Sequence, residues 1–235
     1  MKYYSPLILG FIALCTTTGC IEKPTRSTEY APFETVEYDA VLSIVVDLSG
    51  SFHADWQRDG RAHKLFLDLM DQFFTESMGA ESRVLLSQIS NSDSIVLFDG
   101  TPQELANRFR SPESLNHFLA ERSDPSGSKV YQSTKRMFEY LNELNGVTDN
   151  TRVLTVVLSD LKDSQTDREQ WQKAGRAMLE SLKIYAKSGG GIALYFVAEE
   201  EKPRWRKIMD LAEFKPGSFV IEGQLTESPQ LPSFE

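Results

Sequence analysis

The chain has 235 residues, of which 40% are hydrophobic and 25% are charged, and its formal net charge is −9. This length and composition suit one α/β domain with a sizeable core and additional terminal segments. The acidic balance and the absence of a long basic run argue against binding to a nucleic-acid phosphate backbone, which requires clustered Lys and Arg.

The first residues have the pattern of an export signal. Residues 6–15 form an apolar stretch behind Lys2, which is short for a membrane span but has the size of a signal-peptide core. The string Thr17-Thr18-Gly19-Cys20 resembles a bacterial lipoprotein cleavage site. We therefore expect a signal peptide at 1–19, a lipid on Cys20 and a polar tether at 20–38. Ordinary cleaved secretion and an uncleaved anchor are the alternatives.

This interpretation has two consequences. Cys15 would leave with the signal, so the mature chain would keep only Cys20 and could form no internal disulfide. Ile21 follows Cys20, and the absence of an Asp there favours the periplasmic side of the outer membrane over the inner membrane. We therefore expect a lipid-anchored protein of the cell envelope.

From residue 39 onward, apolar β-branched runs alternate with amphipathic stretches. The patterns predict strands at 41–46, 83–89, 94–98, 151–158, 192–197 and 218–221, and helices at 61–76, within 102–122 in two pieces, and at 130–144, 167–187 and 203–212. The alternation favours a doubly wound α/β fold, Rossmann-like, with a mostly parallel sheet flanked by helices. The short link before 94–98 predicts one antiparallel edge strand. We assign this domain to 39–221 and an acidic, loose tail to 222–235.

Three loops carry the residues with chemical interest. Asp47, Ser49 and Ser51 follow the first strand, Ser128 lies in a Ser-Gly-Ser loop that opens a helix, and Asp160 ends the string LTVVLSD. Loops at the carboxyl edge of a doubly wound sheet converge on one crevice. Carboxylates and hydroxyls are hard oxygen donors, which suit Mg²⁺, Mn²⁺ or Ca²⁺ rather than Zn²⁺.

The pattern resembles a von Willebrand factor type A domain, the fold shared with integrin inserted domains. That family has an adhesion site written Asp-x-Ser-x-Ser, followed by a Thr in a Gly-Gly-Thr loop and an Asp after a later strand. Asp47, Ser49, Ser51 and Asp160 match it, and Ser128 stands in the Thr position, where it keeps the hydroxyl and loses a methyl group.

The resemblance implies how such a site would work. The hydroxyls of Ser49, Ser51 and Ser128 would contact a divalent cation, with Mg²⁺ preferred and Mn²⁺ or Ca²⁺ possible, and Asp47 and Asp160 would act partly through water. A carboxylate from an Asp or Glu of a protein partner would complete the shell. The implied role is adhesion, with no bond broken and no enzymatic activity.

Two other functions fit parts of the pattern. A structural or assembly lipoprotein would use the same fold without a metal, with Asp47 satisfied by backbone amides and hydroxyls. A Mg²⁺-dependent phosphatase of the haloacid dehalogenase type would need a second Asp at the position of Ser49. His53, His63 and His117 are expected at solvated positions, which gives no support to a zinc hydrolase. Asp163 is expected to be a loop or capping residue.

Overall fold

A computed structural model describes residues 36–50, 52, 60–76, 80–124 and 126–223. Its centre is a six-stranded sheet in the order β3-β2-β1-β4-β5-β6. The strands are β1 (Ala40–Asp47), β2 (Ser82–Ile89), β3 (Val96–Gly100), β4 (Arg152–Leu158), β5 (Gly191–Tyr195) and β6 (Phe219–Ile221). All neighbours pair in parallel except β2 and β3. The predicted doubly wound sheet with one antiparallel edge strand is therefore confirmed.

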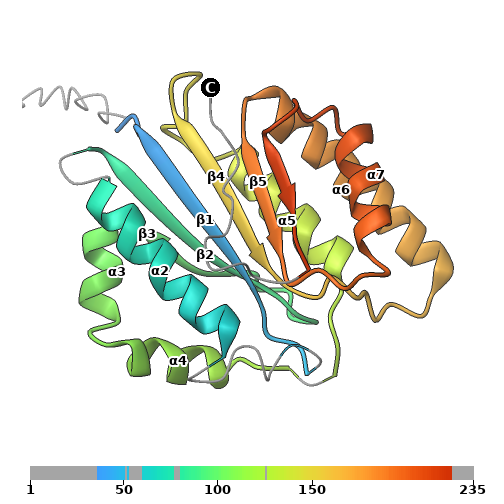
Figure 1. The fold of residues 1–235 in the computed structure, drawn as a ribbon, viewed down its shortest axis with the longest axis horizontal. Helices are drawn as coiled ribbons and strands as arrows, with labels where there is room; N and C mark the ends of the chain where they lie inside the picture. Colours follow the sequence, from blue (N-terminus) through green and yellow to red (C-terminus); the bar gives the residue numbers. More distant parts are fainter. Residues whose placement is uncertain (1–35, 51, 53–59, 77–79, 125, 224–235) are drawn as a thin grey trace, which may run out of the picture. The chain divides into compact units, whose positions relative to one another are not determined.

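Six helices of the described chain cover the sheet. They are α2 (Arg61–Glu76), α3 (Pro102–Arg108), α4 (Pro112–Ala120), α5 (Val130–Asn142), α6 (Arg168–Lys187) and α7 (Lys202–Leu211). Helices α2, α3 and α4 lie on one face of the sheet, and α5, α6 and α7 lie on the other (Figure 1). The break that the sequence predicts near Ser111 and Pro112 separates α3 from α4, because Ser111 caps α4 and Pro112 opens it.

The central strand β1 is buried along its whole length. Its side chains alternate between the two layers, so Ile44 packs with the α2 side and Val45 with the α5 side. A strand covered on both faces has no polar side to show, which explains its continuous apolar run. Both hydrophobic layers pack against β1, so the position of its carboxyl end is fixed.

The edge strand β3 begins and ends two residues later than the sequence predicts. Its last two residues are Asp99 and Gly100 rather than loop residues. Asp99 pairs with Leu85 in the ladder, and the carboxylate of Asp99 accepts hydrogen bonds from Nε and Nη2 of Arg83, at 2.5 and 2.8 Å. The Arg83 guanidinium and the Tyr140 hydroxyl hold the pKa of Asp99 below its usual range despite partial burial. This ion pair extends the strand past the apolar run.

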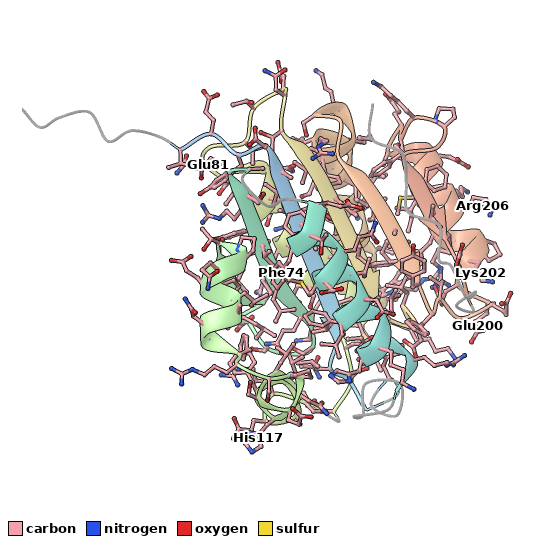
Figure 2. All side chains as sticks on the ribbon, turned by 60° about the vertical axis from the view of Figure 1, so that its left-hand side comes forward. Phe74, Glu81, His117, Glu200, Lys202 and Arg206 are labelled. Atoms are coloured by element: carbon pink, nitrogen blue, oxygen red, sulfur yellow. The ribbon has the colours of Figure 1, made fainter. Side chains whose placement is uncertain are left out.

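The histidines test one further expectation. His63 is 3% exposed on the buried side of α2, so its predicted surface position is wrong. His63 follows Ala62 at the flank of the apolar stripe, and the packing of α2 buries this flanking position as well. His117 lies at the surface of α4, as predicted (Figure 2). His53 lies outside the described residues, as do Cys20 and the signal peptide.

No helix in the described ranges is long and apolar enough to cross a membrane.

Candidate cation-binding site

The candidate site lies at the point where the strand order changes sides: β2 and β3 lie on one side of β1, and β4, β5 and β6 lie on the other. From β1 the chain moves through α2 to β2 on one side, and it later returns to β4 on the other side of β1. The carboxyl ends of β1 and β4 therefore adjoin at the switch point, at the lower edge of the sheet in Figure 1. Ligands of open α/β folds bind at such an edge.

The register of this strand pair places Asp47 beside Ser159. Val46 is paired with Leu158, so Asp47, the last residue of β1, adjoins Ser159, which directly follows β4. The Ser159 hydroxyl donates a hydrogen bond of 2.5 Å to Oδ2 of Asp47 and accepts one from the Leu161 amide. Ser159 was not among the predicted site residues. Its signal in the sequence was its place directly before Asp160 at the end of a buried strand.

Asp47 is a fully buried carboxyl group. Its Oδ1 accepts the Ser49 amide at 2.9 Å, and the Ser49 hydroxyl also hydrogen-bonds to it. Burial, and to a lesser extent the nearby charge of Asp160, raises the pKa of Asp47 to about 6 against the opposing effect of these hydrogen bonds. Among the described residues no salt bridge neutralises Asp47 or Asp160. The site thus has a deficit of positive charge.

Asp160 is half-buried and stands at a sharp turn. The following residue, Leu161, has φ of 59°, in the left-handed region that a Leu adopts at a cost of about 1 kcal/mol or more. The turn is held because Leu161 is buried in the core and its amide binds Ser159. Asp160 Oδ1 accepts the Lys162 amide at 3.0 Å. This hydrogen bond fixes the Asp160 carboxyl just after β4, near enough to Asp47 for its charge to raise the pKa of Asp47.

Ser128 is joined to the loop that contains Asp160. Its hydroxyl donates to the carbonyl of Lys162 at 3.0 Å, and its own carbonyl accepts both the amide and the hydroxyl of Ser164. Gly127 precedes it with φ of 119°, and a Cβ at this position would stand 2.5 Å from the Ser164 hydroxyl oxygen. Only glycine permits this close approach, so the Ser-Gly-Ser sequence is required for Ser128 to dock.

The loop after β1 is tied to the Ser128 loop from the other side. Ser49 forms a parallel bridge with Asp124, whose amide donates to the Leu48 carbonyl at 2.9 Å. The Ser123 hydroxyl donates to the same carbonyl at 3.0 Å. The residues around Asp47, Ser128 and Asp160 are thus joined by hydrogen bonds into one cluster. Ser51 lies outside the described residues.

Asp163 has a different role from a site ligand. Its Oδ2 accepts the Tyr131 amide in the first turn of α5, and its Oδ1 accepts the Gln165 amide. The N-cap residue of α5, Lys129, makes no side-chain cap. Asp163 therefore caps α5 from a distant part of the chain, within the range of roles predicted for it.

The donor set fits a small hard cation. Asp47, Asp160, Ser49 and Ser128 offer only oxygen, and a buried carboxyl with a half-buried one nearby, neither in a salt bridge among the described residues, is stabilised by a divalent ion. No group of three or more His, Cys, Asp or Glu side chains that could hold a metal occurs in the described residues. A site of two carboxylates with hydroxyls differs from such a group, because half of its donors are neutral.

The chain was compared with known proteins. No protein-family model matches it, and no curated protein matches it. Among solved structures, the pilus adhesin SpaC from Lactobacillus rhamnosus GG in its open conformation matches with a TM-score of 0.53 and 16% identity. The match covers 80% of this chain and 28% of the SpaC chain. A second form of SpaC gives a TM-score of 0.52.

The fold is von Willebrand factor A-like. The SpRpn10 VWA domain also matches, with a TM-score of 0.48, 16% identity, and coverage of 82% of this chain and 90% of that one. This chain corresponds to less than a third of the adhesin. At 16% identity the likeness shows the von Willebrand factor A-like fold alone, and the cation site rests on the residues of this chain.

Proposed function

We propose that this von Willebrand factor A-like domain binds a protein partner through a divalent cation held by Asp47, Ser49, Ser51, Ser128 and Asp160. The observation that supports this most strongly is the fully buried Asp47 carboxyl, which has Asp160 beside it and no basic side chain in a salt bridge with it among the described residues. A buried charge of this kind is costly unless something neutralises it. Mg²⁺ is the preferred ion, and Mn²⁺ or Ca²⁺ are alternatives.

The serines and the aspartates of the site would have different roles. The hydroxyls of Ser49 and Ser128 are neutral ligands, so they leave a cation electrophilic, while Asp47 and Asp160 supply the negative charge that retains it. When bound, the cation supplies a positive point to which a carboxylate of an Asp or Glu on the partner can attach. No bond is broken, so the proposal is adhesion without catalysis.

The proposed location of the protein is the periplasmic side of the outer membrane, where a lipid would anchor it. The Cys20 motif supports a lipid anchor, and Ile21 supports the periplasmic side of the outer membrane. Replacing Cys20 by Ser should then release the protein from the membrane fraction, as seen by immunoblotting. A Cys20→Ser protein that stays in the membrane fraction would contradict the anchor but would leave the cation site in place.

A thermal shift experiment tests the cation. At a Mg²⁺ concentration about a hundred times its Kd, the free energy of unfolding should rise by about 2.7 kcal/mol, and the melting temperature by about 5–10 °C. Asp47→Asn should abolish this rise because it removes the central ligand charge. Asp71→Asn is the control, since Asp71 is an exposed carboxyl on α2. A wild-type melting temperature that does not respond to Mg²⁺, Mn²⁺ or Ca²⁺ would exclude the site.

The metal-independent assembly function makes the opposite prediction for partner binding. Asp47 already accepts hydrogen bonds from Ser49 and Ser159, so the fold does not require the ion. Pull-downs from envelope fractions with Mg²⁺ and with EDTA distinguish the two functions. Loss of the partner in EDTA, and with Asp47→Asn, supports the cation site, whereas retention in both cases supports metal-free assembly.

A further inference from the structure

A cleft of about 530 Å³ lies between α5 and α6, next to the candidate site. Its walls are formed by stripes at helical spacing, with Lys129, Gln132, Lys135 and Arg136 on one side and Gln170, Trp171, Lys173, Ala174 and Ala177 on the other. We call it the α5–α6 cleft. Its volume falls within the range of clefts that bind ligands.

The lining of this cleft is basic in a chain that is acidic overall. Lys129, Lys135, Arg136 and Lys173 contribute four positive charges, and Asp163 is the only acidic residue in its lining among the residues that the structure describes. Both Asp163 oxygens already accept backbone amides. The full chain has a net charge of −9. This local reversal of sign gives the cleft a preference for an anionic ligand.

The cations are available to a ligand to different degrees. Lys135 pairs with Glu139 and Arg136 pairs with Asp93, both at the surface, where such pairs contribute little and exchange readily. Neither Lys129 nor Lys173 forms a salt bridge within the part of the chain that the structure describes. Both lysines line the cleft, Lys129 from the N-cap position of α5 and Lys173 from α6.

The cleft is continuous with the loops of the candidate site. Lys129 directly follows Ser128, and Asp163 and Gln165 belong to the loop that begins at Asp160. A second groove of about 340 Å³ lies between α6 and α7, and Trp171 lines both spaces. Arg176, Arg204 and Lys207 line this groove, and Arg204 pairs with Glu201 at 2.7 Å. Arg206, labelled in Figure 2, adds another exposed cation on α7.

We propose that the α5–α6 cleft binds an acidic segment of the protein partner, next to the carboxylate that the cation site takes. The inference rests on the proposed function, because it takes the ligand to be a protein. Trp171 supplies an apolar wall, held by Tyr131 with ring centroids 5.1 Å apart and by Arg204, 5.4 Å from its ring. A short acidic segment can lie wholly within the basic cleft, whereas the longer phosphate backbone of a nucleic acid would extend over the acidic remainder of the surface and be repelled there.

The probe is a short fluorescein-labelled peptide of Glu and Gly, with a Gln and Gly peptide as its neutral match. Binding to the full chain is followed by fluorescence anisotropy in Mg²⁺ and in EDTA. Lys129→Glu with Lys173→Glu should weaken binding of the acidic peptide by about tenfold or more in both conditions, because two attractive contacts become repulsive. Lys187→Glu with Lys215→Glu, at exposed positions outside the cleft, is the charge-matched control and should change it little. Lys173→Gln alone, a milder surface change, should give a smaller loss.

The outcomes separate the two proposals. Binding that is lost with the cleft variants but is the same in Mg²⁺ and EDTA supports the cleft and contradicts the cation site. Equal weakening by the cleft and control variants, or equal binding of the Gln peptide, overturns the cleft, as does the absence of binding. Tighter binding of a single-stranded oligonucleotide at the same lysines would replace the acidic protein segment with a nucleic acid and also overturn the inference.

Discussion

The Asp47 carboxyl combines complete burial with an acidic neighbour and two hydrogen-bonded serines. Its folded-state pKa of about 6 lies above its ordinary value of 3.8. The folded protein therefore retains a proton that the unfolded chain would release. The stability contributed by this proton is complete below the ordinary value and is lost as the pH rises through the folded value. At neutral pH the metal-free fold therefore holds an unfavourable charge, which a bound cation would offset.

Asp47→Asn should consequently stabilise the metal-free protein near neutral pH. We expect a gain of up to about 3 kcal/mol in EDTA, since each pKa unit corresponds to about 1.4 kcal/mol, and a gain that shrinks toward pH 4. Urea denaturation followed by circular dichroism across this pH range measures it, with Asp71→Asn as the exposed control. A variant less stable than the wild type at pH 7 in EDTA would show that Asp47 is satisfied without a cation.

At the scale of elements, the loop after β4 organises the site by satisfying helix and strand ends. Ser159 holds Asp47, Asp160 turns the chain, and Asp163 caps α5. The same few residues thus position the site and stabilise α5, the helix that begins two residues after Ser128. The N-terminus of α5 depends on this contact because Lys129, its own N-cap residue, makes no cap bond.

Removal of the Asp163 cap should therefore weaken the fold measurably. We expect Asp163→Ala to lower the free energy of unfolding by about 1 kcal/mol, and by up to about 2, the usual range for loss of a helix cap. Asp163→Asn should lose less, because it keeps an acceptor oxygen. Chemical denaturation measures both. Equal losses for the two variants would indicate that the negative charge, rather than the hydrogen bond, stabilises α5.

At the scale of the whole domain, the sheet separates two hydrophobic layers that meet only through its strands. Ile44 packs in the layer with α2, and Ile192 packs in the layer with α5, and each is fully buried. Both layers hold β1 and β4, whose ends carry the site. The rigidity of the site therefore comes from two independent cores.

The two layers should respond independently to small cavities. Ile44→Val and Ile192→Val should each lower the free energy of unfolding by about 0.5–1.5 kcal/mol, and the double variant should equal their sum within about 0.5 kcal/mol. Equilibrium denaturation of the three proteins provides the comparison. A large departure from additivity would mean that strain passes through the sheet, so that the layers act as one core.

The sequence by itself determined the element order, the parallel sheet with its antiparallel edge, and the loops that carry Asp47, Ser128 and Asp160. Apolar runs, helical spacing and glycine turns are local signals, and local physics sets them. The shift of β3 to include Asp99 and the burial of His63 depended on partners far along the chain. Cross-strand pairing and helix packing are non-local, so neither could be predicted from the pattern of one segment.

Only the tertiary structure decided how the site is held together. The register of β1 against β4 places Ser159 against Asp47, and the turn at Leu161 brings the Lys162 amide to the Asp160 carboxyl. The basic α5–α6 cleft likewise exists only because two helices distant in sequence pack side by side. The sequence specifies which oxygen and nitrogen groups are present. Their mutual distance, and therefore their electrostatic coupling, is a property of the folded chain.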